Sequence, residues 1–212
     1  MLVTLTFDNG PHPDVTPAVL DVLSDRDVKA TFFVVGDRLT ADGGRQLAER
    51  AHAEGHWIGN HTMTHSIPLG VDTSAEYAEV EIERTQDLIG DLRHPDRFFR
   101  PFGEGGHVNA KLLSRAAVDL LERGGYTCVL WNCVPHDWEH PFAWVETALH
   151  DVARLEQAVV VVHDQPTGGM AHLDRFIDGV RAVGGEFVQD FPDEVLPIKW
   201  GHPGDLRGIV TT

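Results

Sequence analysis

The sequence predicts one α/β domain built around a parallel sheet. About seven short apolar, β-branched segments alternate with longer segments of helical periodicity, which is the pattern of repeated β–α units. The chain has 212 residues, enough for one sizeable core, and shows no linker, internal repeat or low-complexity stretch. Periodicity alone leaves two architectures open, a small barrel and an open doubly wound sheet.

Each predicted strand is a short apolar run that ends in polar or glycine residues. The first run, LVTLTF, leads into Asp8, Asn9 and Gly10. The run AVVVV ends at His163 without a polar interruption, as expected for a parallel strand that is buried on both faces. The strands are expected at residues 2–7, 29–35, 56–60, 97–100, 126–132 and 158–162, with a short one near residue 187.

The predicted helices begin at residues that commonly start or cap helices. Thr16 and Pro17 provide an N-cap and a first-turn proline. Thr73 and Glu76 form a capping box, and Asn109 is expected to cap a later helix. Helices are expected from residue 16, over about 40–54, over 73–92, from 109, from 141 and over about 170–183.

A single domain is expected to span residues 1–190, followed by a tail at residues 191–212 that packs on the same domain. The tail contains several prolines and glycines, so we expect irregular structure there. Cys128 and Cys133 lie at opposite ends of a predicted strand, too far apart for a disulfide, and are expected to be free thiols.

The composition argues against several kinds of partner. A formal net charge of -16 disfavours nucleic acid and anionic membrane surfaces. The sequence has no apolar run of about 18 residues, so no transmembrane helix is expected. Met1 leads directly into the first strand, so a cytoplasmic protein is expected, or a secreted one if a leader precedes Met1 in the natural protein. Nothing in the sequence predicts an oligomeric state.

Candidate functional side chains all follow the carboxyl ends of predicted strands. They are Asp8, Asn9, His61, His65, Arg100, Asp137, Trp138 and His163. Parallel α/β folds place their sites at this rim. Because His61 and His65 are four residues apart, one helical turn would bring both imidazoles to a single metal ion. Taken alone, Asp8 could instead brace a turn, Arg100 could be a structural ion-pair partner, and His163 could be a hydrogen-bonded core histidine.

Five short motifs in this order resemble those of the polysaccharide deacetylases of the NodB homology type, carbohydrate esterase family 4. The first and second are TFDNG at residues 6–10, similar to the family's TFDDG, and HTMTH at residues 61–65, which matches H-[ST]-x-x-H. The remaining three are RPFG at residues 100–103, the Asp137–Trp138 pair, and VVH at residues 161–163. The resemblance spans about residues 2–190.

The resemblance implies a distorted (β/α)7-type barrel and the metal-dependent removal of acetyl groups from an acetylated carbohydrate. It implies that Asp8 is the general base and that His163 is the acid. It also implies a divalent metal ion, zinc first and cobalt or nickel as alternatives, held by Asn9, His61 and His65.

The remaining motif residues would support these roles. Arg100 would orient the Asp8 carboxylate and keep it ionised, and Asp137 would tune His163. Phe102, Trp138 and Val161 would line the substrate pocket. The residues also fit this chemistry directly, because hydrolysis of an amide needs a base and an acid whose pKa values differ.

Two departures from the family pattern carry their own expectations. Asn9 replaces a charged ligand with a neutral one, so weaker metal binding and a more electrophilic metal are expected. The third motif is one residue short, which leaves Arg97 as a weaker alternative to Arg100. Two other functions remain open: hydrolysis of another C–N bond in a small metabolite, and carbohydrate binding without catalysis by a domain that lost its metal through the change at Asn9.

Overall fold

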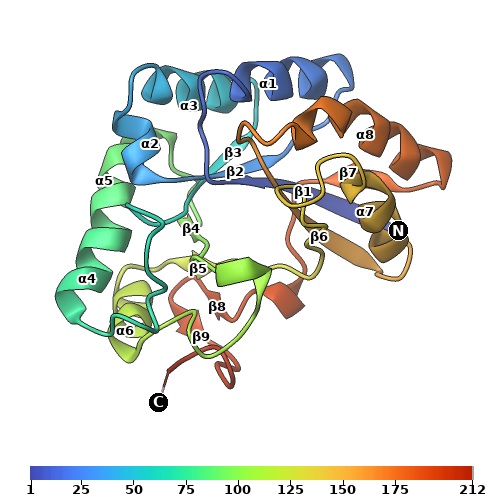
Figure 1. The fold of residues 1–212 in the computed structure, drawn as a ribbon. Helices are drawn as coiled ribbons and strands as arrows, with labels where there is room; N and C mark the ends of the chain where they lie inside the picture. Colours follow the sequence, from blue (N-terminus) through green and yellow to red (C-terminus); the bar gives the residue numbers. More distant parts are fainter. Residues whose placement is uncertain (212) are drawn as a thin grey trace.

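Strand β1 (Leu2–Asp8) is the buried centre of a strongly curled sheet (Figure 1). The computed structural model describes residues 1–211. Neighbouring strands follow the order β6-β1-β2-β3-β4-β5-β8-β9, and β7 pairs with the first half of β1. The other strands are β2 Thr31–Val34, β3 Trp57–Asn60, β4 Phe98–Phe99, β5 Thr127–Cys128, β6 Gln157–His163, β7 Glu186–Val188, β8 Ile198–Lys199 and β9 His202–Pro203.

The segment that follows β5 brings the two ends of the parallel part of the sheet together. The Cys133 N–H donates to the Val159 carbonyl at 3.2 Å, and the Val161 N–H donates to the Cys133 carbonyl at 3.0 Å. The sheet is therefore a distorted, incompletely closed barrel rather than an open sheet. This confirms the fold that the motifs imply.

Alternation along β1 separates the core from the site. Val3, Leu5 and Phe7 pack beneath the helices in a continuous apolar cluster. Because successive side chains of a strand point to opposite faces, Thr6 and Asp8 face the interior of the curled sheet. The alternation of β1 thus places the polar side chains of Thr6 and Asp8 inside the barrel.

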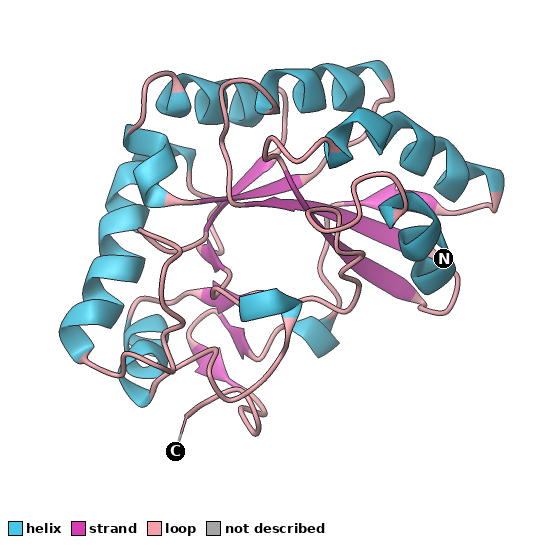
Figure 2. Cartoon of the chain, in the orientation of Figure 1, coloured by secondary structure: helices cyan, strands magenta, loops and turns pink. Residues whose placement is uncertain are grey.

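Helices cover the outside of the sheet (Figures 1 and 2). Neighbouring helices contact one another in the order α7-α8-α1-α3-α2-α5, and α4 packs on α6. The α-helices are α1 Thr16–Asp25, α2 Gly36–Thr40, α3 Gly44–Ala53, α4 Ala75–Glu79, α5 Thr85–Ile89, α6 Arg115–Arg123, α7 Trp144–Val152 and α8 Leu173–Ala182. A π-helical turn, η1 (Val80–Arg84), joins α4 to α5, and short 3-10 turns lie at η2 Gly90–Leu92, η3 Glu104–Gly106, η4 Gly169–His172 and η5 Asp193–Val195.

All three expected helix caps are wrong, two of them at helices α4 and α6. Helix α4 is capped by Ser74, whose hydroxyl accepts from the Tyr77 N–H at 3.3 Å, and not by the pair Thr73 and Glu76. Helix α6 is capped by Ser114. The side chain of Asn109 instead accepts from the Lys111 N–H at 2.9 Å in a local turn, which competes with helix formation.

Other elements are shorter or more divided than expected. The helix expected over residues 40–54 is the shorter α3, and α2 is a separate short helix before it. The strands expected at 97–100 and 126–132 keep only two residues each. Thr16 is the first residue of α1 rather than its cap, and its hydroxyl donates to the carboxyl group of Asp164. The neighbouring Pro17 does lie at the helix start, as expected.

The residues after 190 are more regular than expected. Strand β8 pairs antiparallel with β5 through Cys128 and Ile198, and β9 pairs with β8. Ile198 is fully buried, and the Leu130 N–H donates to the Val195 carbonyl at 2.8 Å. Cys128 and Cys133 are both free and buried, as expected. No helix within residues 1–211 has the length and apolar character needed to cross a membrane.

Candidate active site

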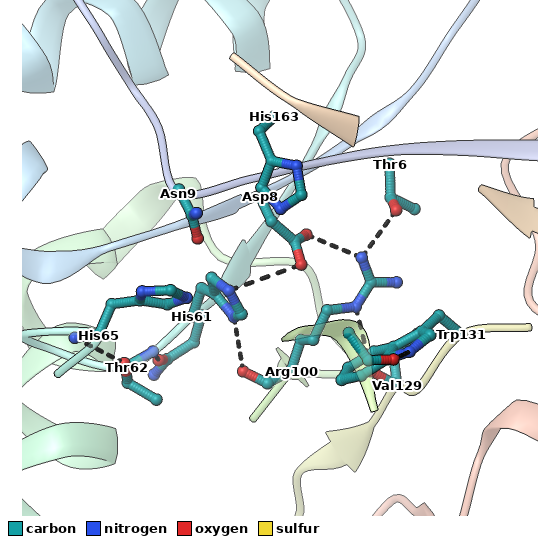
Figure 3. Close-up of polar contacts among 12 residues, drawn as sticks. Thr6, Asp8, Asn9, His61, Thr62, His65, Arg100, Val129, Trp131 and His163 are labelled. Atoms are coloured by element: carbon teal, nitrogen blue, oxygen red, sulfur yellow. Dashed lines mark hydrogen bonds and ion pairs between the residues drawn. The ribbon is translucent and has the colours of Figure 1, made fainter. Parts of the chain in front are cut away.

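Strand register brings the two central groups of the site together. Asp8 and His163 are directly paired residues of the neighbouring strands β1 and β6. Their side chains lie at the carboxyl end of both strands, where Asn9 begins the next loop (Figure 3). The adjacency of a carboxyl group and an imidazole therefore follows from the parallel pairing of two buried apolar strands.

Arg100 is fully buried and binds Asp8 directly. One guanidinium nitrogen, Nη1, donates to Asp8 Oδ1 at 2.8 Å and to Thr6 Oγ1 at 2.7 Å (Figure 3). The guanidinium plane also lies over the Phe33 ring at 4.0 Å from its centroid. Arg97 lies elsewhere, with its guanidinium 4.2 Å from the ring centroid of Tyr126. The structure thus joins Arg100, and not Arg97, to Asp8 although the motif is one residue short.

The surroundings of Asp8 keep it ionised. Burial by itself raises the pKa of a carboxyl group, but the charge of Arg100, together with the charge of His163 and the hydrogen bond from Arg100, outweighs burial and lowers the pKa of Asp8. The other oxygen of the carboxylate, Oδ2, lies 3.5 Å from His61 Nε2. Asp8 is therefore a carboxylate with one oxygen fixed by Arg100 and the other facing the pocket.

Asp137 binds both the ring and the backbone of His163. One carboxylate oxygen accepts from the His163 ring at Nδ1 at 2.8 Å, and the other accepts from the His163 backbone N–H at 3.0 Å. Burial lowers the pKa of the imidazole, but the hydrogen bond to Asp137 and its charge outweigh burial and raise it. The ring therefore favours its protonated form. Trp138 packs edge-on against it, with ring centroids 4.8 Å apart.

The two histidines of the HTMTH segment lie together, but not on a helix. Residues 61–65 are irregular, with left-handed backbone at Thr62 (φ 68°) and His65 (φ 51°). This loop places the rings of His61 and His65 4.8 Å apart between centroids. The expectation that a helical turn pairs them is wrong, because hydrogen bonds from neighbouring elements shape the segment instead.

Both imidazoles are neutral. Burial outweighs the charge of Asp8 and lowers the pKa of His61, and burial together with His61 lowers the pKa of His65 to about 3. His61 Nδ1 lies 2.9 Å from the Arg100 carbonyl, which can only accept, so this nitrogen carries the proton. Nε2 of His61 is then left with a free lone pair toward Asp8.

These donors fit a divalent cation. Asn9 Oδ1 is buried without a hydrogen-bond partner, and Figure 3 shows the Asn9 side chain directed toward the two histidine rings. Within residues 1–211, no three His, Cys, Asp or Glu side chains form a metal site, so a site here needs the amide oxygen of Asn9 as its third donor. Two neutral imidazoles and one amide oxygen are acceptable but weak ligands for zinc, cobalt or nickel.

A pocket of about 360 Å³ opens over these groups. It is lined by the expected Phe102, Trp138 and Val161. It is also lined by Gly103 of the RPFG motif and by residues that the motifs do not identify, namely Trp131, Val134, Gln165, Thr167, Gly105 and Gly106. Trp131 steadies the glycine-rich loop by donating from Nε1 to the Gly106 carbonyl at 2.8 Å. His107 is exposed beside this loop and is not part of the lining.

Two buried carboxyl groups just outside the pocket were not expected from the sequence. Asp164 follows His163 and lies against the loop after Asn9, where a Cβ on Gly10 would overlap both of its carboxyl oxygens. Glu81 accepts hydrogen bonds from the HTMTH loop. The acid directly after a buried strand was a signal that could have identified Asp164. No sequence signal distinguishes Glu81 from the other acids of its helix.

The fold and the site together define a class of protein. The rim of a distorted α/β barrel carries a carboxyl group with a lowered pKa, an imidazole with a raised pKa and two imidazoles with lowered pKa values around one pocket, an arrangement suited to hydrolysis. Residues 1–127, more than half of the chain, match the family described as polysaccharide deacetylase. The chain belongs to this family.

Known proteins agree with this assignment. A peptidoglycan-N-acetylglucosamine deacetylase from Listeria monocytogenes is 30% identical over 188 residues, which are 88% of this chain and 37% of that protein. The chain thus spans little more than a third of that relative's length.

Two solved structures are similar along nearly their whole length. A family 4 carbohydrate esterase from Streptomyces lividans, in complex with acetate, has a TM-score of 0.73 and 28% identity, and covers 93% of this chain and 96% of its own. A family 4 acetyl xylan esterase from Clostridium thermocellum, in complex with a cobalt ion, has a TM-score of 0.71 and 29% identity, over 89% of this chain and 87% of its own.

Proposed function

We propose that this protein is a metal-dependent hydrolase that removes acetyl groups from N- or O-acetylated sugars of a polysaccharide or oligosaccharide. One observation carries the proposal. Asp8, fixed by Arg100, and His163, fixed by Asp137, are paired across β1 and β6 at the floor of one pocket. Membership of the polysaccharide deacetylase family supports this choice of reaction.

Asn9, His61 and His65 would hold the metal ion, because the amide oxygen of Asn9 has no hydrogen-bond partner and both imidazoles are neutral. When bound, such an ion polarises a carbonyl group and acidifies a water molecule. The cobalt ion of the Clostridium thermocellum esterase supports a divalent ion in this family. Zinc is our first choice, with cobalt and nickel as alternatives.

Asp8 acts as the general base. Its carboxylate accepts a proton from water as the water oxygen bonds to the acetyl carbon. Arg100 is suited to keep this carboxylate ionised and correctly turned, because it occupies one oxygen and leaves the other free toward the pocket. A buried arginine remains charged at any working pH, so the base stays available across the neutral range.

His163 acts as the general acid. As the C–N or C–O bond to the sugar breaks, its imidazolium gives a proton to the departing nitrogen or oxygen, and acetate is the other product. The proton taken up by Asp8 and the one lost by His163 then exchange with solvent, which restores the starting state. Asp137 keeps the imidazole protonated and aims it, because it occupies Nδ1 and leaves Nε2 for the substrate.

The walls of the pocket suit a small acyl group. Trp138 and Val161 provide apolar surface beside His163, and Phe102 packs on His65 with 4.0 Å between ring centroids. Such a surface accommodates a methyl group and excludes bulk water from the reacting carbonyl. Gln165 and Thr167 offer hydrogen-bonding groups for sugar hydroxyls on the same lining.

Acetate release tests the proposal. The protein, loaded in turn with zinc, cobalt and nickel, is incubated with chitooligosaccharides, peptidoglycan fragments, acetylated xylan and small amides. We expect release from at least one carbohydrate, abolished by chelation and lowered about 10²–10⁴-fold in the Asp8→Asn variant. Release from small amides alone would replace the carbohydrate substrate by a small metabolite. No release from any substrate with any metal would overturn the proposal.

The presence of Asn9 favours one alternative function, a domain that binds carbohydrate without hydrolysing it. Its amide cannot supply the negative charge of a carboxylate ligand. In that case the protein binds chitooligosaccharides in calorimetry, contains no stoichiometric metal, and releases acetate only after the Asn9→Asp change. Activity of the unaltered chain excludes this alternative.

A further inference from the structure

The loop that carries His61 and His65 has a conformation that its own residues do not favour. Thr62 and His65 have φ values of 68° and 51°, and a left-handed backbone is rare for a β-branched residue such as Thr. Such conformations persist only where the surroundings fix them. Within the loop, the His65 N–H donates to Thr62 Oγ1 at 3.2 Å. The other contacts that hold the loop come from neighbouring elements.

Helix α2 and Glu81 hold opposite sides of this loop. The first two amides of α2 bind its carbonyl groups: Gly36 N–H donates to the Thr62 carbonyl at 3.0 Å, and Asp37 N–H donates to the Met63 carbonyl at 2.9 Å. Glu81 binds its amides. Oε2 of Glu81 accepts from the N–H groups of Met63 and Thr64, each at 3.0 Å.

The second oxygen of Glu81, Oε1, accepts from the hydroxyl group of Thr64 at 2.8 Å. All three partners of this carboxylate are therefore neutral groups of one loop. The side chain is also deeply buried, since Glu81 is only 1% exposed. A buried carboxylate without a cationic partner is costly, which indicates that its position serves more than stability.

The π-helical turn η1 presents Glu81 to the loop. A π turn inserts an extra residue into a helix and changes which side chains face a given neighbour, and such turns are frequent at functional sites. The same turn also binds the residue before the loop. Asn60 Nδ2 donates to the Ile82 carbonyl at 2.8 Å, while Asn60 Oδ1 accepts from the Thr62 N–H at 3.0 Å. Both the start and the middle of the HTMTH segment are thus attached to η1.

We propose that Glu81 is a positioning residue, whose carboxylate shapes the loop so that His61 and His65 present their free nitrogens to one metal ion. This inference rests on the proposed function, because it assumes that the two imidazoles bind a metal. It adds a specific requirement to that function, an acid on η1 that touches neither metal nor substrate. The requirement is a hydrogen-bond acceptor at this place, rather than a negative charge in the pocket.

Three variants test the proposal. Glu81→Ala removes all three acceptor contacts. Glu81→Gln keeps one oxygen that can accept from both amides. Thr64→Ala removes the hydroxyl contact to Glu81, together with the hydrogen bond between the hydroxyl groups of Thr64 and Ser66. Glu79→Ala is the matched control, because it removes an exposed acid from the same helical segment. For each protein, Co²⁺ affinity is measured by titration of the visible absorption of the bound ion, and amide exchange is measured at Met63 and Thr64 in the metal-free protein.

We expect Glu81→Ala to weaken Co²⁺ binding about 10–100-fold, the usual effect of losing a group that orients metal ligands. Faster amide exchange at Met63 and Thr64 should accompany this loss. Glu81→Gln should recover most of the affinity, Thr64→Ala should lose less than Glu81→Ala, and Glu79→Ala should match the unaltered protein. If Glu81→Ala does not fold, the order of affinities among Thr64→Ala, Glu81→Gln and the control decides.

A folded Glu81→Ala protein with unchanged Co²⁺ affinity and unchanged exchange would overturn the proposal. A purely structural role would lower the unfolding temperature equally with and without Co²⁺ and leave the affinity of the folded protein intact. Failure of the proposed function has a different signature, since the unaltered protein would then bind no Co²⁺. In that event the exchange rates at Met63 and Thr64 decide whether Glu81 shapes the loop.

Discussion

At the scale of single residues, Asn9 distinguishes this chain most clearly from the family motif. Its left-handed backbone (φ 72°) is tolerated by Asn and Asp alike, so the geometry of the position does not require the amide. Its Oδ1 is buried and without a hydrogen-bond partner, as a ligand atom would be. The difference between Asn and Asp at this position is therefore one of charge rather than shape.

Replacing Asn9 with Asp should tighten metal binding. A carboxylate adds a negative charge to a site whose other donors are neutral, and even changes outside the ligand shell alter affinity about 10–100-fold. We therefore expect a dissociation constant for Zn²⁺ that is lower by about tenfold or more. It is measured by competition with a chromophoric chelator. Asp14→Asn, a change in the following loop, serves as the control. Equal affinities for both residues at position 9 would mean that this side chain is not a ligand.

If His163 is the general acid that we propose, Asp137 should set the upper pH limit of activity. The imidazole must be protonated to act as an acid, so activity should fall as pH rises through its pKa. Because Asp137 raises the pKa of His163, Asp137→Asn should move the alkaline limb of the kcat/KM profile to lower pH, by about 1–3 pH units. Glu139→Gln, on the same loop, should leave this limb in place. An unchanged limb in Asp137→Asn would show that another group supplies the proton.

At the scale of elements, buried carboxyl groups fasten the loops that the strands deliver. Asp164, at the end of β6, accepts from the Thr16 hydroxyl at the start of α1, and the same hydroxyl oxygen accepts from the His12 N–H at 2.8 Å. The loop between Asn9 and α1 is held in this way against β6. Burial raises the pKa of Asp164 to about 7, so the group is neutral over the acidic range.

The raised pKa of Asp164 makes stability depend on pH. The folded chain keeps a proton that the unfolded chain releases above its ordinary pKa, so the free energy of unfolding falls as pH rises from about 4 to about 7 and is then constant. Relative to Asp164→Asn, the unaltered protein should lose about 1.4 kcal/mol per pH unit in that window. Urea denaturation at several pH values measures both proteins. Parallel curves would contradict a proton held by Asp164.

Elements were predicted well where local pattern decides them. The positions of β1 and β6 and the presence of helices α1, α6 and α8 follow from the apolar runs and from helical periodicity. Starts of helices were predicted less well. For α4, the expected Thr73 lies next to the true cap, Ser74. For α6, Asn109 and Ser114 are both residue types that cap helices, so residue type does not choose between them. The choice depends on how the intervening leucines, 112 and 113, pack in the core.

At the scale of the whole molecule, the residues after 190 extend the sheet beyond β5. Val195, Ile198 and Ile209 join the apolar cluster inside the sheet, and the Leu113 N–H donates to the Ile209 carbonyl at 3.0 Å. This segment covers strand β5, which would otherwise be an exposed edge. The far end of the chain is therefore part of the same core as the site.

Truncating Ile198 should destabilise the entire domain. Ile198 is fully buried, and replacing a buried Ile with Ala costs about 2–5 kcal/mol. Val183→Ala is the control, since Val183 is 63% exposed and exposed changes stay within about 0.5 kcal/mol. Urea midpoints measure both. A small effect of Ile198→Ala would mean that the C-terminal segment folds on the barrel without supporting it.

The sequence by itself determined the alternation of strands and helices and the position of most motifs at strand ends, and hence the set Asp8, His61, His65 and His163. These features depend on residues that are close together in the sequence, so the local periodicity of the sequence predicts them. Only the tertiary structure decided that Arg100 rather than Arg97 reaches Asp8, that a non-helical loop pairs the two histidines, and that Glu81 and Asp164 fasten the loops. Each of these depends on contacts between residues that are distant in sequence, and a local sequence pattern does not show how strong such contacts are.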